Sequence, residues 1–134
     1  MVVVEQCDIY SNDYVGIEIR DYANPLIKGG KIRDGKRSGI LVCAHGMGTI
    51  EGDCHIFSNA FFGVLIMAGG HPVLRACHIN DNGYYSISAD GQSGGVIEVD
   101  CDLTSKVGGE LYIEAGCRLQ DKRKKSLFSP FKRR

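Results

Sequence analysis

Cys-His-Ile-Phe-Ser-Asn at residues 54–59 returns as Cys-His-Ile-Asn-Asp-Asn at residues 77–82, and an earlier version, Cys-Asp-Ile-Tyr-Ser-Asn, stands at residues 7–12. The isoleucine of this hexapeptide belongs to a column that recurs every 23 or 24 residues: Ile9, Ile32, Ile56, Ile79 and Leu103. Two more apolar columns keep the same period: Ile17, Ile40, Val64, Ile87 and Leu111, and Val4, Ile27, Ile50, Leu74 and Ile97. A fixed period of this size predicts a solenoid, in which each repeat buries its apolar face against its neighbours.

Within one repeat, apolar residues at spacing two indicate short strands with one face turned inward. The first repeat contains three such segments, at residues 7–10, 17–20 and 26–28. Stacked repeats would then form three short parallel sheets around a narrow core filled with Ile, Val and Leu. The sequence therefore predicts an all-β fold, a single-stranded parallel β-helix of about five coils.

Charge divides the chain into two parts. Residues 1–120 hold nine basic and fifteen acidic residues, a net charge of −6, whereas residues 121–134 hold seven basic and one acidic, a net charge of +6. We expect a β-helix domain over residues 1–119 and a basic tail without regular structure over residues 120–134. Because Val4 is already in register with Ile27, we expect either a fragment of a longer β-helix or the terminal end of one, and its uncapped coil edges could associate end to end.

Four of the six cysteines share one column, in which Gly30 is the only gap: Cys7, Cys54, Cys77 and Cys101. Strands of neighbouring coils lie ~4.8 Å apart, so a disulfide bridge is geometrically conceivable. Cysteine is nevertheless among the most buried residue types, and we expect this column to pack as small apolar side chains. Free thiols, with no secretory signal and no long apolar segment, predict an intracellular protein that does not span a membrane.

Two polar columns accompany the apolar ones. Asn12, Asn59 and Asn82 align with Gly35, and both residue types tolerate left-handed backbone angles. Stacked inward Asn side chains can also hydrogen-bond to one another along the axis. A second column alternates in sign without exception, and we expect it to form a solvated charge ladder that fixes the register of the strands: Glu5, Lys28, Glu51, Arg75 and Glu98.

The middle strands carry outward residues that no ladder explains. In coils two and three these are Leu41, Cys43, Leu65 and Met67. The turn before each middle strand holds two aromatic-rich columns, and one of them must also face solvent. The first is Tyr14, Arg37, Phe61 and Tyr84, and the second is Val15, Ser38, Phe62 and Tyr85. Exposed apolar patches mark interfaces, where aromatic and Met side chains are enriched. The first alternative is that these residues pack against parts of the same protein outside this chain. The second is that they are assigned to the wrong face of the strand. We predict a partner-binding surface of Leu41, Cys43, Leu65, Met67, Phe61, Phe62, Tyr84 and Tyr112.

Candidates for metal binding or catalysis are weaker. His55 and His78 share an outward column and could stack near a carboxylate, but no third ligand is fixed and Lys31 stands beside them, so we expect solvated histidines and no cofactor. Glycoside hydrolysis needs carboxylates that converge on one groove, with inverting enzymes holding them ~6.5–9.5 Å apart. Here the outward carboxylates are spread over different faces or paired with Lys and Arg in the charge ladder, and Asp53 and Asp100, near Asp102, fall at the extra residue of the 24-residue coils. We therefore predict no enzymatic activity.

The basic tail offers two further readings. Lys122, Arg123, Lys124 and Lys125 form a compact run that suits a nuclear import signal or contact with nucleic acid, and the tail could equally be solvated or dock on the acidic body. We expect a cytoplasmic protein, with the nucleus as a second compartment, and no other nucleic-acid contact. Ser129-Pro130 suits a proline-directed kinase or a turn, and whether Ser126 or Ser129 is phosphorylated stays open.

The recurring Cys-x-Ile hexapeptides, with the intervening Gly-Val-Leu-Ile at residues 63–66 and Gly-Gly-His-Pro-Val-Leu at residues 69–74, resemble the right-handed β-helix repeats of F-box-only proteins and of the Shc SH2-binding protein family. The resemblance covers residues 4–119. It implies a right-handed helix that holds substrates for a cullin-RING ubiquitin ligase or mediates signalling contacts. The sequence itself contains no F-box segment, so an adaptor role would depend on sequence outside this chain.

These observations predict a non-catalytic module that binds a protein partner or substrate, with substrate recognition for an F-box-type ubiquitin ligase as its finer form. The alternative is a carbohydrate-binding or polysaccharide-cleaving β-helix of the pectate-lyase kind, since related repeats occur in carbohydrate-active enzymes.

Overall fold

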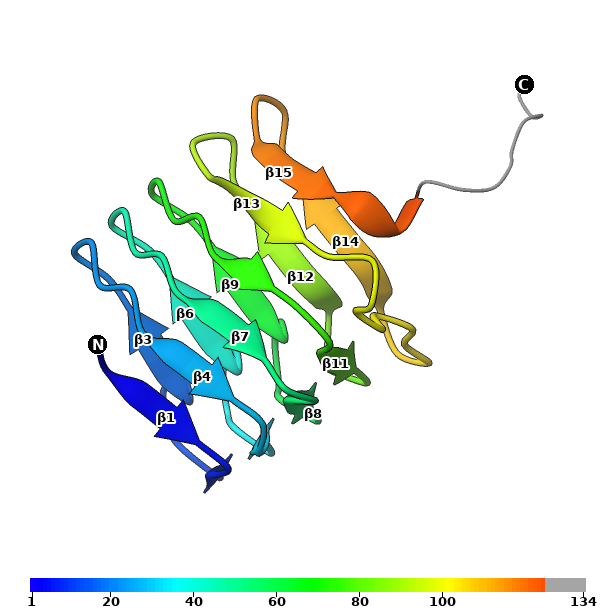
Figure 1. Cartoon of the computed structure of the whole chain (residues 1–134). Coiled ribbons are helices and arrows are strands. Elements are labelled where there is room, and N and C mark those ends of the chain that lie inside the picture. Colours follow the sequence, from blue (N-terminus) through cyan, green and yellow to red (C-terminus); the bar gives the residue numbers. More distant parts are fainter. Residues whose placement is uncertain (125–134) are drawn as a thin grey trace.

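The computed structural model describes residues 1–124. Its strands stack into three parallel sheets along one axis, and β1 and β15 lie at opposite ends of the stack (Figure 1). Sheet A runs in the order β1 (Val3–Glu5), β4 (Leu26–Lys28), β7 (Thr49–Glu51), β10 (Val73–Leu74), β13 (Gly94–Ile97) and β15 (Arg118–Asp121). Sheet B contains β2 (Asp8–Tyr10), β5 (Lys31–Arg33), β8 (His55–Phe57) and β11 (His78–Asn80). Sheet C contains β3 (Ile17–Ile19), β6 (Ile40–Val42), β9 (Val64–Ile66), β12 (Tyr85–Ala89) and β14 (Gly109–Ile113).

The predicted parallel β-helix is confirmed, strand by strand in the first coil. Each apolar column of the sequence is a ladder of directly paired residues, such as Val4↔Ile27, Ile32↔Ile56 and Ile40↔Val64. The inward side chains of coils two to four are almost wholly buried and form one continuous core. In coil five Asp102 makes only a bridge to His78, so sheet B has one strand fewer than sheet C.

The cysteine column belongs to this core. Cys54, Cys77 and Cys101 are buried, whereas Cys7 is exposed in the first coil, and all six cysteines are free thiols. Burial raises the pKa of Cys54 to about 12. Gly30 fills the gap in the column because a Cβ there would collide with the backbone of Cys7.

The turn between sheets B and C is held by the predicted asparagine stack. The side-chain amide of Asn59 donates to Oδ1 of Asn82 at 3.0 Å, and its own Oδ1 accepts from the backbone N–H of Gly35 at 3.1 Å. The expectation that Asn and Gly take left-handed angles here is wrong. The positive φ falls one residue earlier in coils one to four: Ser11, Asp34, Ser58 and Asp81.

The charge ladder of sheet A is present and runs one rung further than expected. Lys28 pairs in register with Glu5 and Glu51, and Arg75 lies 3.3 Å from Glu51. The added rung is Lys122, whose Nζ lies 3.5 Å from a carboxylate oxygen of Glu98.

Regular structure also continues past the domain boundary predicted at residue 119. Strand β15 ends at Asp121, and a short 3-10 helix, η1 (Lys122–Lys124), follows it. Within this segment the guanidinium of Arg123 donates to Asp121 and to Glu110, at 3.0 and 3.1 Å. Burial opposes the positive charge of Arg123, yet these two carboxylates raise its pKa overall. The described part of the chain holds no helix long and apolar enough to cross a membrane.

Candidate functional site

The outer face of sheet C carries two columns of outward side chains. Strand register places Leu41 next to Leu65, and Leu65 next to Ser88, while Ile40, Val42, Val64 and Ile66 on the same strands point into the core. The next outward position along each strand holds Cys43 in coil two and Met67 in coil three. The predicted facing is therefore correct, and the apolar members of both columns are neighbours in coils two and three.

These four side chains differ in how far they meet solvent. Met67 is 40% exposed, and Leu65 and Cys43 are half-buried. Leu41 is only 7% exposed, so the expectation that its side chain meets solvent is wrong. It stands between the outward side chains of Glu18 and Leu65, ~4.8 Å from each strand, and lies beneath the surface that they form.

A ladder of aromatic side chains and Arg37 lies next to these four side chains, in the turn before sheet C. The guanidinium carbon of Arg37 lies 6.0 Å from the ring centre of Tyr14 and 5.9 Å from that of Phe61. Phe61 in turn stacks on Tyr84, with ring centres 5.4 Å apart and planes 7° from parallel. Tyr14 and Tyr84 are each 52% exposed, whereas Ser38 of the other column is buried. The column that faces solvent is thus the one that contains Tyr14, Arg37, Phe61 and Tyr84.

The remaining two predicted contact residues extend the surface. Phe62 packs edge-on against Tyr84, with ring centres 5.5 Å apart. Tyr112 lies two coils above Leu65 in the same outward column, is 50% exposed, and leans on Tyr85 at 5.4 Å. We define the sheet C patch as Cys43, Leu65, Met67, Phe61, Phe62, Tyr84 and Tyr112. Tyr14 and Arg37, which continue the ladder, were left out of the predicted site although their spacing of 23 residues already aligned them with Phe61.

Charged groups border the patch on the side of coil one. Arg20 pairs with Glu18 at 3.1 Å and with Asp21 at 3.2 Å. Burial and the carboxylate of Glu18, 3.8 Å from Sγ, raise the pKa of the Cys43 thiol. Cys43 is therefore a protonated, weakly polar surface group at neutral pH and not a nucleophile.

Asp90 borders the patch on the side of coil four. Its carboxylate accepts hydrogen bonds from the backbone N–H of Ala68 at 2.9 Å, from the backbone N–H of Gln92 at 3.1 Å and from the hydroxyl of Ser93 at 2.7 Å. Burial works against ionisation, but these bonds outweigh it and lower the pKa of Asp90. The ionised carboxylate of Asp90 thus stabilises the turn after sheet C by accepting these three hydrogen bonds.

Sheet A presents a second outward column, apolar except for Thr49, that the sequence alone did not reveal. Its members pair directly from coil to coil and are half-buried or exposed: Val3, Leu26, Thr49, Val73 and Val96. The column is one residue wide, because the other outward position on these strands holds the charge ladder. The available signal was the same 23- or 24-residue spacing, read one position before the inward column.

The two candidate metal ligands, His55 and His78, lie against each other beside two carboxylates. The rings of His55 and His78 stack with centres 4.5 Å apart. Nε2 of His78 lies 3.3 Å from Asp53, and its Nδ1 lies 3.9 Å from Asp102. Among residues 1–124 no group of three His, Cys, Asp or Glu side chains is arranged to hold an ion.

Two of the three carboxylates considered for catalysis, Asp100 and Asp102, are engaged with backbone groups, whereas Asp53 lies beside His78. Asp100 accepts a hydrogen bond from the N–H of Ala76 at 2.9 Å. Asp102 accepts one from the N–H of Thr104 at 3.0 Å, and that bond lowers its pKa. In the basic run, Lys122 and Arg123 are ion-paired as described above, Lys124 ends η1, and Lys125, Ser126 and Ser129 lie outside the described residues.

Three parallel sheets, a coil of 23 or 24 residues and one continuous inward core define a β-solenoid. The family described as right-handed β-helix region matches residues 1–122, which is nearly the whole described chain. The chain therefore belongs to this family. No curated protein and no solved structure matches it in the corresponding searches.

Proposed function

We propose that this β-helix is a non-catalytic module that binds a protein partner through the sheet C patch. The observation that carries the proposal is the apolar surface of coils two and three, where Leu65 and Met67 meet solvent beside the Phe61–Tyr84 stack. The fold does not require these side chains to be apolar, because the core lies on the other side of the sheet.

Desolvation would supply the energy of binding. Removing apolar surface from water contributes roughly 25 cal/mol per Å², and a few buried aromatic or Met anchors dominate most interfaces. The aromatic ladder is already ordered by stacking and by Arg37, so its side chains would lose little freedom on binding.

A protein partner fits this surface better than a glycan does. Sugars stack on open aromatic faces, and here the faces of Phe61 and Tyr84 lie against each other. Catalysis on a glycan finds no support in the carboxylates either, since Asp90, Asp100 and Asp102 serve as acceptors for backbone N–H groups.

In its finer form the proposal is substrate recognition for an F-box-type ubiquitin ligase, in the cytoplasm or the nucleus. It is supported by the likeness of the repeats and by six free thiols, which suit a reducing compartment. The test of this form is the full-length gene product: an F-box in it and co-purification with a cullin would support adaptor function, and a signal peptide would contradict it.

Affinity capture from cell extract tests the patch itself. Leu65→Asp should retain the fold and lose the captured partners, because a carboxylate at this position would be desolvated in the interface. The matched control is Val73→Asp, which makes a similar change at a half-buried outward position of sheet A.

If the Leu65→Asp variant still captures the same partners, the sheet C patch is not the binding surface. If only the Val73→Asp variant loses them, the binding surface lies on sheet A. Turnover of a polyuronate that disappears in Asp100→Asn or Asp102→Asn would replace binding by catalysis.

A further inference from the structure

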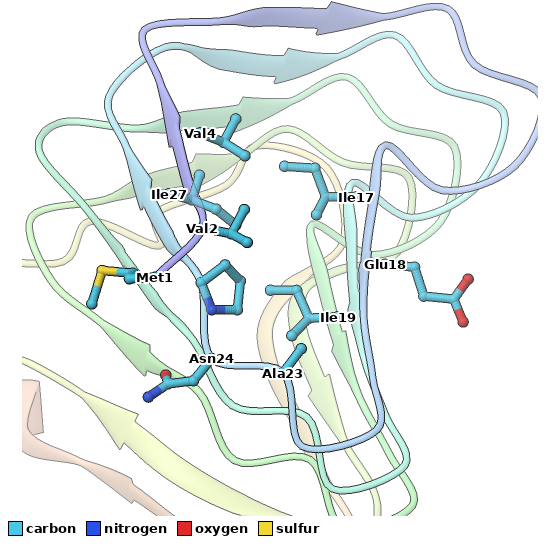
Figure 2. Close-up of a pocket in the computed structure, with 10 residues that line it drawn as sticks. Met1, Val2, Val4, Ile17, Glu18, Ile19, Ala23, Asn24 and Ile27 are labelled. Carbon is cyan, nitrogen blue, oxygen red and sulfur yellow. The ribbon is translucent and has the colours of Figure 1, made fainter.

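Solvent reaches the cysteine column unevenly. In coil one Cys7 is exposed, and Ile17 lines a cavity (Figure 2). Cys54 and Cys77, in coils three and four, are 0% exposed, whereas Cys101 in coil five is 8% exposed. Cys101 is therefore the buried member of the column that a small molecule from solvent can touch.

Cys77 and Cys101 occupy equivalent positions in consecutive coils. The bridge His78↔Asp102 sets their register, and the backbone N–H of Asp102 donates to the carbonyl of Cys77 at 2.8 Å. Neighbouring coils place paired Cα atoms ~4.8 Å apart, within the ~4.4–6.8 Å that a disulfide spans. Coil five makes only this bridge here, whereas β8 in coil three pairs on both sides. The backbone beside Cys101 can therefore adjust to the geometry of an S–S bond.

The two sulfur atoms differ in chemical character. The thiol of Cys77 has three acceptors within reach: the carbonyl oxygen of Ile50 at 3.0 Å, that of Arg75 at 3.2 Å, and the sulfur of Cys101. The hydrogen bond from the Cys77 thiol, helped by its backbone N–H, lowers the pKa of Cys101 against the opposing effects of burial and of Asp100. The same bond, together with burial, raises the pKa of Cys77. Cys101 thus has thiolate character, and Cys77 stays a thiol.

Thiolate character decides which sulfur reacts with an oxidant, because the thiolate and not the thiol is the nucleophile. Cys54 is the contrasting case, since burial raises its pKa to about 12 and it does not meet solvent. We propose that Cys101 is an oxidation site for hydrogen peroxide, and that Cys77 converts the oxidised sulfur into a disulfide between coils four and five. This inference is independent of partner binding by the sheet C patch.

Oxidation of the pair takes two steps. The sulfur of Cys101 attacks one oxygen of the peroxide, the O–O bond breaks, and Cys101 becomes a sulfenic acid. The other oxygen leaves as water with the proton that the Cys101 thiol released, so the sulfur has lost two electrons and the peroxide has gained them. The sulfur of Cys77 then attacks the oxidised sulfur, the S–O bond breaks, and hydroxide leaves as water with the Cys77 proton. Two thiols and one peroxide give one disulfide and two water molecules.

Peptide mapping of the full chain after treatment with hydrogen peroxide tests the proposal. Trypsin cuts after Lys and Arg, so Cys77 and Cys101 stay together in the fragment of residues 76–106, whereas Cys54 lies in the fragment of residues 38–75. The remaining thiols are alkylated in denaturant before digestion. Fragment 76–106 should then carry no alkyl group and be lighter than its reduced form by two hydrogen atoms. Dithiothreitol should reverse the change.

Three variants separate the roles of the cysteines. Cys101→Ala should slow the oxidation of Cys77 at least about tenfold, because the thiol left behind is fully buried and protonated. Cys77→Ala should stop at the sulfenic acid of Cys101, which dimedone labels. Cys54→Ala is the matched control, because it removes the same side chain from the adjacent coil and should form the disulfide like the unchanged chain.

Full alkylation of both thiols in fragment 76–106, at a peroxide dose that oxidises the exposed Cys7, would overturn the proposal. So would a disulfide that joins fragment 38–75 to fragment 76–106 in place of the internal one. Equal oxidation rates of Cys77 in the unchanged chain and in Cys101→Ala would remove Cys101 as the site of attack.

Discussion

Sheets A and C pair their strands in the same parallel way but present different outer faces. On sheet A an apolar column one residue wide runs beside a ladder of alternating charges. On sheet C both outward columns are apolar in coils two and three, and an aromatic ladder lies next to them. The charge ladder has a role within the fold, since it favours one register. The sheet C patch has no such role, which makes it the better candidate for a function outside the fold.

The largest expected difference lies between the two sides of strand β9. Ile66→Ala should lower the free energy of unfolding by about 2–5 kcal/mol, because Ile66 is fully buried and its loss leaves a cavity. Leu65→Ala should cost about 1 kcal/mol or less, because its side chain already meets solvent. Urea unfolding measures both. Similar losses would mean that the outer face of sheet C is a second core and not a free surface.

Asp90 tests whether polar groups beside the patch are structural. Asp90→Ala should cost about 1.5–3 kcal/mol, because an ionised acceptor of three hydrogen bonds is removed. The pKa of Asp90 is lowered from 3.8 in the folded chain, so its contribution is full above that value and fades as the pH falls through the folded pKa. Unfolding curves should therefore converge for the two proteins in acid. A constant difference down to low pH would show that charge plays no part.

Lys28→Glu should break the ladder of sheet A without touching sheet C. It replaces two favourable neighbours by two repulsive ones, at ~0.2–1 kcal/mol for each pair. We expect a lower melting temperature at low salt, recovery at high salt, and unchanged partner capture. A loss of stability that does not depend on salt would indicate that the aliphatic part of Lys28 matters more than its charge.

Arg37→Ala should have the smallest effect. Each contact of its guanidinium with Tyr14 or Phe61 is exposed and worth about 0.5 kcal/mol. Thermal unfolding should change little, while partner capture should weaken if the ladder is part of the interface. Unchanged capture would restrict the interface to Leu65, Met67 and their neighbours.

The sequence predicted the fold because the columns record which residues pair between coils. Spacing alone placed Ile32 beside Ile56 and Asn59 beside Asn82, and it located the strands of the first coil within a residue of their ends. It could not place the left-handed residue, since Ser58 and Asp34 adopt this angle although Asn59 and Gly35, which follow them, are the residue types that favour it. Nor could it foresee Lys122 as a rung, because the basic composition around that residue suggested an unstructured tail.

The candidate site was predicted less completely. Facing follows from the period of two along a strand, so Leu65 and Met67 were placed correctly. Exposure depends on the size of neighbours in adjacent coils, so Leu41 came out buried under Glu18 and Leu65. The outward column of sheet A was not predicted, because only the charged residues of these strands were assigned to the outer face. The residues two positions before them, such as Val3 before Glu5, also point outward.

Hydroxyl-radical footprinting of the complex with a captured partner tests the central claim most directly. Met67 and Tyr112 are oxidisable, exposed and on the sheet C patch, whereas Tyr10 and Tyr22 are more exposed than either and lie outside it. The partner should slow labelling of Met67 and Tyr112 several-fold and leave Tyr10 and Tyr22 unchanged. Protection confined to Val3 and Val73, with Met67 still labelled at its free rate, would contradict the assignment and place the interface on sheet A.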